Sequence, residues 1–149
     1  MMSNVTDREM MSRALKLAAK GRFTSSPNPT VGCVITVDGK VVGEGFTRPA
    51  GGNHAEIEAL QSAGDVTGAT AYVTLEPCCH QGKTGPCTDA LIAAGVVRVV
   101  VACEDPNPKV AGLGLAALLA AGIDVQSGLL EDQARNINKG TLLMRITPP

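Results

Sequence analysis

The stretch VVRVVVAC, residues 96–103, is apolar at every position except Arg98. Most of its residues are β-branched, and apolar side chains occupy both of its alternating sides, which predicts a strand covered on both faces. Gly95 precedes this stretch, and the loop DPNP, residues 105–108, follows it. Strands of this kind are typical of sheets that have helices on either side, so we expect a layered α/β protein.

The segments on either side of this strand alternate between helical and extended patterns. We expect a hairpin at 31–46 with its turn at Asp38 and Gly39, further strands at 69–77 and 123–128, and helices at 6–21, 54–63, 87–95, 113–122 and 130–140. Thr6 and Glu9 fit a capping box at the start of the first helix. These elements predict a three-layer α/β/α sandwich with a mixed sheet of about five strands.

Length and composition exclude several classes of protein. A chain of 149 residues with 44% hydrophobic residues is long enough for one domain that buries its own core. A net charge of −1 and three aromatic residues give no basis for binding nucleic acid or an anionic membrane. No apolar run approaches the roughly 20 residues of a membrane span, and no signal-peptide pattern opens the chain, so we expect a cytoplasmic protein.

The five cysteines are odd in number and unevenly spaced, which favours metal binding or catalysis over a disulfide framework. Three short motifs lie at the ends of expected elements, namely HAE at 54–56, PC at 77–78 and a second PC at 86–87. One imidazole and two thiolates form a donor set that suits zinc and leaves a fourth position open for water. We therefore predict a catalytic zinc site.

The two cysteines that follow prolines are the expected thiolate ligands. Proline restricts the backbone before Cys78 and Cys87, and each thiolate can face the amides of a following turn or helix. Cys79 is adjacent to Cys78, and neighbouring side chains rarely reach the same ion. We predict that His54, Cys78 and Cys87 hold one zinc ion per chain and that Cys79 does not.

Glu56 lies two positions after His54, in the first turn of the expected helix. A carboxylate at that place can accept a proton from water at the metal and deliver it to a leaving group. The order H-x-E, then P-C, then a second cysteine is typical of zinc deaminases, although their C-x-x-C spacing is absent here. A structural zinc site would have no need of this carboxylate, which argues against a non-catalytic zinc-stabilised binding module.

Other residues near these motifs have two interpretations each. Cys33 and Cys103 lie inside and at the end of expected strands, where we expect buried thiols. His80 adjoins the ligands and is either an ordinary loop residue or a substrate contact. Asp105 and Asn107 either bond to the local backbone or bind substrate at the carboxyl end of a central strand.

Several of these segments together resemble one known family. PNPTVGCVI at 27–35, HAE at 54–56, the long block at 71–114 that contains LEPCCHQGKTGPC, and AGIDV at 121–125 are similar to the deaminase domain of the bacterial riboflavin-biosynthesis deaminase–reductases. The resemblance covers about residues 7 to 145 and implies a cytidine-deaminase-like fold. It implies hydrolysis of the C2 amino group of 2,5-diamino-6-ribosylamino-4(3H)-pyrimidinone 5′-phosphate, with release of ammonia.

Carried over by position, the resemblance gives the same zinc ligands and assigns the proton shuttle to Glu56. It implies substrate contacts at Asn28, His80, Lys83, Thr84, Asp105 and Asn107, with the phosphate at Lys83. Thr47 stands where members of the family commonly carry a histidine that contacts substrate, and Gly85 stands where they commonly carry proline.

The resemblance also concerns partners and domain organisation. We expect residues 1–149 to form a single zinc-dependent deaminase domain without the reductase domain that normally follows, either as a natural stand-alone enzyme or as a chain cut at the domain border. A homo-oligomer is expected, and a separate reductase is the expected partner. A deaminase of the same fold for another base, a nucleotide or tRNA is the alternative, although charge and scarce aromatics disfavour tRNA.

Overall fold

The computed structural model describes residues 4–20, 30–47, 54–78, 87–106 and 111–137. Its helices are α1 (Asn4–Lys20), α2 (Ala55–Ser62), α3 (Cys87–Ala94), α4 (Leu113–Ala120) and α5 (Glu131–Ile137), and its strands are β1 (Gly32–Val37), β2 (Lys40–Phe46), β3 (Thr70–Val73), β4 (Arg98–Val101) and β5 (Asp124–Ser127). These elements follow the order that the sequence predicts.

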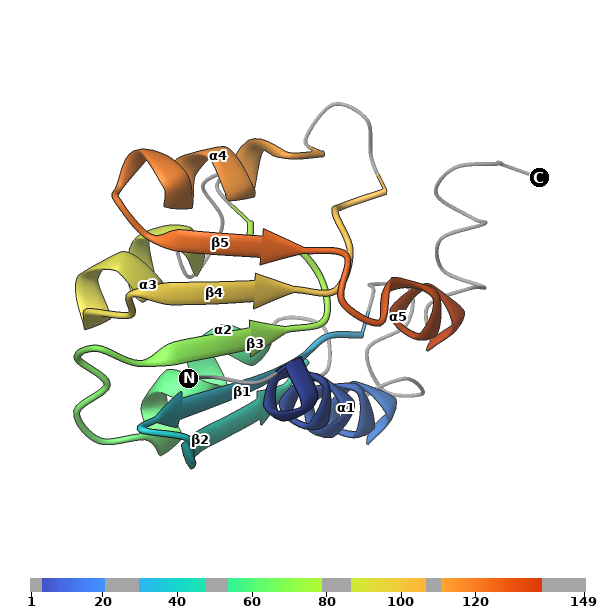
Figure 1. Ribbon diagram of the computed structural model, residues 1–149, viewed down its shortest axis with the longest axis horizontal. Coiled ribbons are helices and arrows are strands. Elements are labelled where there is room, and N and C mark those ends of the chain that lie inside the picture. The colour runs from blue at the N-terminus through green and yellow to red at the C-terminus, as the bar shows by residue number, and fades with distance from the viewer. Residues whose placement is uncertain (1–3, 21–29, 48–53, 79–86, 107–110, 138–149) are drawn as a thin grey trace.

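The five strands form one mixed sheet in the order β2-β1-β3-β4-β5, which Figure 1 shows from bottom to top. β1 pairs antiparallel with both β2 and β3, whereas β3–β4 and β4–β5 are parallel. Asp38 and Gly39 form the turn between β1 and β2, with φ angles of 52° and 78°. The expected hairpin and the expected parallel units are therefore confirmed, with β4 inside the sheet.

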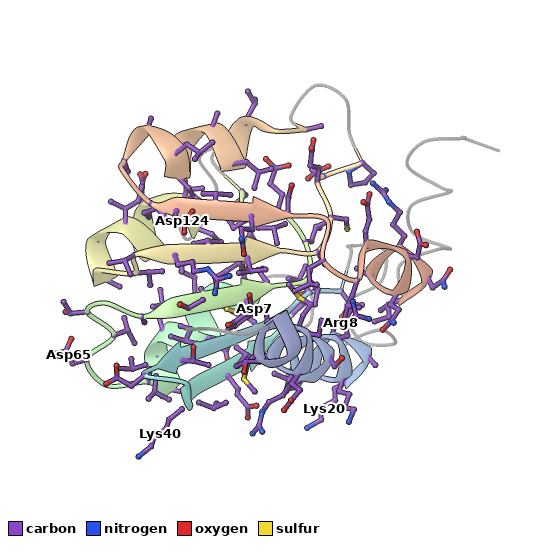
Figure 2. The ribbon with its side chains drawn as sticks, in the orientation of Figure 1. Asp7, Arg8, Lys20, Lys40, Asp65 and Asp124 are labelled. Carbon is purple, nitrogen blue, oxygen red and sulfur yellow. The ribbon has the colours of Figure 1, made fainter. Side chains whose placement is uncertain are left out.

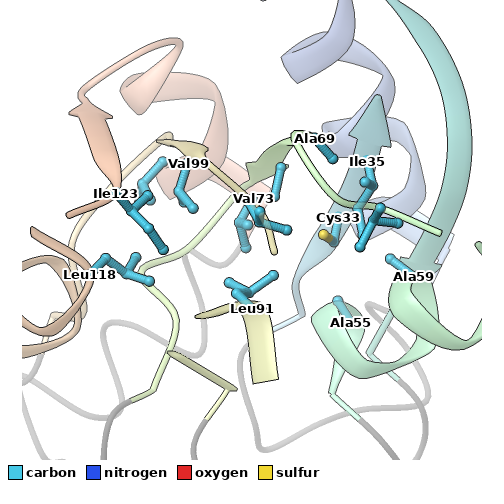
Figure 3. Close-up of a cluster of buried hydrophobic side chains, with 14 residues drawn as sticks. Cys33, Ile35, Ala55, Ala59, Ala69, Val73, Leu91, Val99, Leu118 and Ile123 are labelled. Carbon is cyan, nitrogen blue, oxygen red and sulfur yellow. The ribbon is translucent and has the colours of Figure 1, made fainter. Parts of the chain in front are cut away.

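Helices cover both faces of the sheet. On one face, Val73 and Val99 pack with Ala55 of α2, Leu91 of α3 and Leu118 of α4, as Figure 3 shows. On the other face, a second cluster contains Met11 and Leu15 of α1, Tyr72 of β3, Val100 of β4 and Ala134 of α5. Successive residues of β3 and of β4 point to opposite faces of the sheet and pack in different cores, each covered by helices. The predicted three-layer α/β/α sandwich is therefore confirmed.

Three details differ from expectation. α1 includes Asn4 and Val5, so Thr6 lies inside the helix and is not an N-cap residue, which needs non-helical backbone angles. β3 ends at Val73 instead of Pro77, and β4 spans only Arg98–Val101. Backbone hydrogen bonds nevertheless continue past both strands, from the Thr74 amide to the Gly32 carbonyl and from the Glu76 amide to the Cys103 carbonyl.

A close approach between β2 and α2 fixes the start of that helix. A β-carbon on Gly45 would lie 2.4 Å from the Ala55 carbonyl oxygen and 2.6 Å from the Ala59 amide nitrogen. Only glycine permits this contact, so the helix lies against the strand with His54 immediately before its first residue.

Charged side chains such as Lys20, Lys40 and Asp65 project from the surface in Figure 2, whereas Asp7, in the first turn of α1, is buried. None of the described helices has the length and apolar character needed to cross a membrane.

Candidate metal centre

Three separate elements bring the predicted zinc ligands together. His54 is the residue before α2 and has extended backbone angles, Cys78 follows β3, and Cys87 is the first residue of α3. The amide of Thr88 donates to the carbonyl of Cys78, which holds the start of α3 against the chain that leaves β3. The ligands therefore meet at the carboxyl end of a parallel strand, where α/β sheets usually bind ligands.

The ligand atoms of these residues lie close enough to hold one ion. The imidazole and the two sulfurs all lie within 4.8 Å of one another. His54 Nδ1 is 3.1 Å from Cys87 Sγ and 3.8 Å from Cys78 Sγ. Zinc–sulfur and zinc–nitrogen bonds of about 2.3 and 2.1 Å in a tetrahedron separate the ligand atoms by roughly 3.5–3.8 Å, so the cluster fits zinc.

The neighbours of Cys78 favour a thiolate at that residue. The hydrogen bond from Cys87 lowers the pKa of Cys78 to about 4, and His54 adds to the effect. The same contact raises the pKa of Cys87, and contact with Cys78 also raises the pKa of His54. The Cys87 amide lies 3.5 Å from Cys78 Sγ and stabilises negative charge there. Zinc binds thiolates and neutral imidazole, so metal binding would release the protons that remain on these ligands.

Glu56 occupies the first turn of α2 with only 4% of its surface exposed. Burial raises the pKa of its carboxyl to about 7, and the nearby Cys78 sulfur contributes in the same direction. A buried carboxyl beside a metal site can hold or release a proton near neutral pH, as a general acid or base requires. The predicted position of Glu56 in the helix is confirmed.

Cys33 and Cys103 are buried, with 0% and 3% of their surface exposed, as predicted for thiols of the core. Cys103 Sγ lies 3.5 Å from the Thr74 carbonyl oxygen, and burial raises the pKa of both thiols. In the described part of the chain, the three predicted ligands are the residues with metal-binding geometry, and neither core thiol belongs to them.

Asp105 lies beyond the carboxyl end of β4, at the same edge of the sheet as Cys78. It lines a cavity of about 400 Å³ together with Cys103, Glu104, Pro106, Ala111, Ser127, Gly128, Glu131 and Arg135. Its backbone amide donates a hydrogen bond to Glu76 Oε1 at 3.0 Å. None of the described residues that line this cavity is a predicted zinc ligand, and the substrate role of Asp105 stays a prediction.

Thr47 follows β2 and is hydrogen-bonded to Val31. Its hydroxyl accepts from the Val31 amide at 2.8 Å and donates to the Val31 carbonyl at 3.3 Å. A threonine hydroxyl has one hydrogen, so Thr47 can offer a substrate only an acceptor. The other predicted substrate contacts lie outside the described residues, namely Asn28, His80, Lys83, Thr84 and Asn107. Cys79 lies outside the described residues as well.

Glu76 was not predicted from the sequence as a site residue, and it is buried with 6% of its surface exposed. The signal was a charged residue in the otherwise uncharged segment ATAYVTLEP at 69–77, immediately before the ligand loop. Charged residues are almost never fully buried unless they have partners. A glutamate in this apolar segment therefore indicated a buried carboxylate with specific hydrogen-bond partners.

Residues 4–103 match the family model of the cytidine and deoxycytidylate deaminase zinc-binding region. The riboflavin biosynthesis protein RibD of Escherichia coli is 61% identical over 137 residues, which are 91% of this chain but only 37% of that protein. A diaminohydroxyphosphoribosylamino-pyrimidine deaminase of Buchnera aphidicola subsp. Schizaphis graminum is 53% identical, and the match covers 90% of this chain and 92% of that protein.

Solved structures agree with these sequences. RibD of Acinetobacter baumannii superposes with a TM-score of 0.94 at 51% identity, over 97% of this chain and 41% of that one. The diaminohydroxyphosphoribosylaminopyrimidine deaminase/5-amino-6-(5-phosphoribosylamino)uracil reductase of Thermotoga maritima superposes with a TM-score of 0.87 at 41% identity, over 93% and 41%. The chain thus spans about two fifths of these longer relatives and nearly all of the shorter deaminase. It belongs to the zinc-dependent cytidine deaminase family and, within it, to the diaminohydroxyphosphoribosylaminopyrimidine deaminases of riboflavin biosynthesis.

Proposed function

We propose that this chain hydrolyses the C2 amino group of 2,5-diamino-6-ribosylamino-4(3H)-pyrimidinone 5′-phosphate, giving 5-amino-6-ribosylaminouracil 5′-phosphate and ammonia. The observation that carries the proposal is the cluster of His54, Cys78 and Cys87 beside the buried carboxyl of Glu56. A relative of nearly the same length that is named for this deamination is 53% identical, which supports the choice of substrate.

The proposed reaction needs a bound metal and a group that transfers a proton. When bound at His54, Cys78 and Cys87, zinc lowers the pKa of a water molecule to about 7 and so supplies a nucleophile. Glu56, a buried carboxyl in the first turn of α2 two residues after His54, would accept the proton of that water and pass it to the departing amine. The helical backbone holds the carboxyl of Glu56 at a set position relative to the ligand His54.

The rest of the substrate needs contacts for its ring, ribose and phosphate. We assign these to Asn28, His80, Lys83, Thr84, Asp105 and Asn107, with Thr47 at the edge of the site. A lysine is a compact positive charge that suits a phosphate dianion, and the neighbouring threonine adds a hydroxyl donor. Because Cys78 and Cys87 enclose the loop with Lys83 and Thr84, its two ends lie at the metal site.

The longer relative from Thermotoga maritima is named for both a deaminase and a uracil reductase. We propose that a reductase also receives the product of this chain, whether on the same or on a separate polypeptide. We further propose that the active enzyme is a homo-oligomer, which sedimentation of the purified protein tests directly.

Release of ammonia from the diaminopyrimidinone phosphate tests the proposed function. The purified zinc-loaded protein should deaminate this compound at least about 100-fold faster than cytidine, deoxycytidylate or guanine. Cytidine and guanine lack the phosphate whose binding energy raises kcat/KM, and deoxycytidylate carries a different ring. Faster deamination of any of these three compounds would assign the site to a different substrate.

A further inference from the structure

The carboxylate of Glu76 accepts hydrogen bonds from the backbone of two other segments. Its Oε1 accepts from the amides of Asp105 and Gly112, each at 3.0 Å, and its Oε2 accepts from the amide of Leu115 at 3.1 Å. Among the described residues, all its hydrogen-bonded partners are backbone amides. A buried carboxylate that accepts from three backbone amides holds those amides in place.

Glu76 also serves the start of α4. Gly112 precedes that helix and has no side chain to accept from the first amides, so the carboxylate of another element accepts from them instead. The helix comes very close, because a β-carbon on Gly114 would lie 2.1 Å from the Pro77 carbonyl oxygen. The chain before Cys78, the start of α4 and the segment around Asp105 are therefore joined at one carboxylate.

This junction links the metal centre to the proposed substrate residue. Glu76 is two residues before Cys78, and its Oε1 bonds directly to the backbone of Asp105. The Glu76 amide donates to the Cys103 carbonyl at 2.9 Å, so both its backbone and its side chain bond to the segment that follows β4. Hydrogen bonds of Glu76 therefore connect the backbone around Asp105 to the chain that leads to Cys78.

We propose that Glu76 is a positioning residue for substrate binding that acts through Asp105, an inference that rests on the proposed function. Removal of its carboxylate should weaken binding of the pyrimidine while the zinc ligands and Glu56 remain. A purely structural role in stabilising α4 would instead lower stability and leave the Michaelis constant unchanged. The two roles predict different results for the double variant. If Glu76 positions Asp105, the effects of the two mutations on KM are not additive, and if Glu76 only stabilises α4, the Glu76 mutation does not change KM.

A double-mutant cycle distinguishes them. Glu76→Ala, Asp105→Ala and the double variant are compared in kcat and KM for the diaminopyrimidinone phosphate, with zinc content measured for each. We expect each single change to raise KM by about tenfold, within the range of energies found for contacting residues. The double variant should raise KM no further than Asp105→Ala alone, because Glu76 acts through that residue.

Two further variants control for stability. Glu76→Gln retains an Oε1 that accepts from Asp105 and Gly112 and loses only the bond from Leu115, so its melting temperature should fall while KM stays within about threefold of wild type. Asp7→Ala removes another buried carboxylate, far along the chain from this junction, and should lower stability without changing KM.

Amide hydrogen exchange provides a test that does not depend on activity. In wild type, the amides of Asp105, Gly112 and Leu115 should exchange slowly, and in Glu76→Ala they should exchange much faster than in Asp7→Ala. Unchanged exchange at Asp105, additive effects on KM, or an unchanged KM in Glu76→Ala would each overturn the proposal.

Failure of the proposed function gives a different result. In that case wild type itself would not deaminate the diaminopyrimidinone phosphate, and the same cycle would be measured with whichever of cytidine, deoxycytidylate and guanine it does deaminate. Coupling of Glu76 to Asp105 with that substrate would uphold the positioning role, and its absence would reject it.

Discussion

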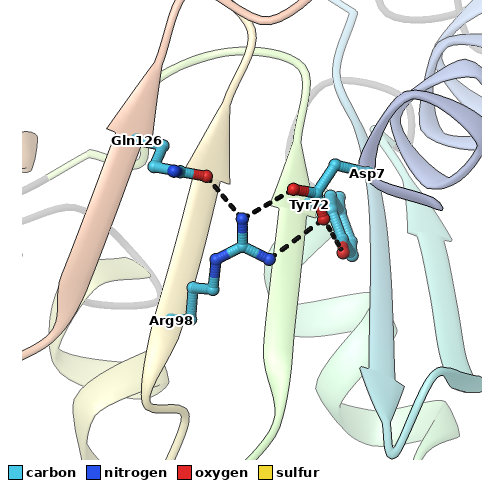
Figure 4. Close-up of polar contacts among 4 residues, drawn as sticks. All are labelled: Asp7, Tyr72, Arg98 and Gln126. Atoms are coloured by element: carbon cyan, nitrogen blue, oxygen red, sulfur yellow. Dashed lines mark hydrogen bonds and ion pairs between the residues drawn. The ribbon is translucent and has the colours of Figure 1, made fainter. Parts of the chain in front are cut away.

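The ion pair between Asp7 and Arg98 joins α1 to β4, and its loss should destabilise the fold measurably. Arg98 donates from Nη1 to Asp7 Oδ1 at 3.0 Å and from Nη2 to Oδ2 at 2.7 Å, and the Tyr72 hydroxyl donates to Oδ1 at 2.7 Å. Figure 4 shows this arrangement, in which Gln126 accepts a further hydrogen bond from Arg98. The Asp7 and Arg98 side chains are only 9% and 17% exposed.

The change Asp7→Asn removes the charge and places an amide donor against an Arg98 donor. Breaking a buried ion pair by removing one partner costs about 3–5 kcal/mol, but Gln126 still partners Arg98 and the guanidinium retains some exposure. We therefore expect a loss of about 3 kcal/mol in the free energy of unfolding. For a chain of this length, that loss corresponds to a fall in Tm of about 6–12 °C.

Urea denaturation of wild type and Asp7→Asn at pH 7 measures the difference. The matched control is Glu131→Gln, which breaks the exposed i,i+4 pair with Arg135 and should cost less than about 0.5 kcal/mol. A loss in Asp7→Asn no larger than in the control would refute the reasoning, because burial would then contribute nothing.

The pH dependence provides a second check on the same pair. Hydrogen bonding from Arg98 holds the pKa of Asp7 below its ordinary value. A carboxyl with a lowered folded-state pKa contributes stability that is complete above its unfolded pKa of about 3.9 and is lost as pH falls through the folded value. The stability difference between wild type and Asp7→Asn should be constant from about pH 8 to 5 and narrow below about pH 4. A difference that persists undiminished into strong acid would contradict this assignment.

Three further predictions concern the metal centre and the substrate. Glu56→Gln should keep its zinc and its fold but lose about 10²- to 10⁴-fold in kcat, since an amide cannot accept and return a proton, and near-normal turnover would place the acid/base elsewhere. Cys78→Ala should lose zinc in metal analysis while Cys79→Ala retains it, and the reverse result would reassign the ligand. Lys83→Ala should raise KM by about 10- to 150-fold, equivalent to the roughly 1.5–3 kcal/mol of a hydrogen bond to a charged group, and should weaken competition by inorganic phosphate. Unchanged KM and phosphate inhibition at full zinc content would place the phosphate elsewhere.

The sequence predicted every element of the fold because each carries a local pattern. The Asp38-Gly39 turn, the two-sided apolar strand and the helix stop at Gly95 depend on backbone preference and side-chain period, which neighbouring residues specify. The residues at which helices and strands begin and end were less predictable. The capping-box pattern at Thr6 was misleading because the helix continues upstream, and the ends of β3 and β4 depend on partner strands rather than on local sequence.

The zinc ligands were predictable for a chemical reason. One histidine and two proline-preceded cysteines at element ends form a donor set that suits one metal, and Glu56 lies at a fixed helical distance from His54. Residue type and short spacing were sufficient, because each ligand is placed by its own strand end or helix start.

The sequence by itself determined the order of the elements, the composition of the metal site and the catalytic candidate. Only the tertiary structure decided which distant residues meet. The carboxylate of Glu76 contacts amides 29 to 39 positions away, and Asp7 pairs with Arg98 across 91 positions. No periodicity reports such contacts, because they arise when packing of the sheet and helices removes these charged groups from water and only particular partners can then satisfy them.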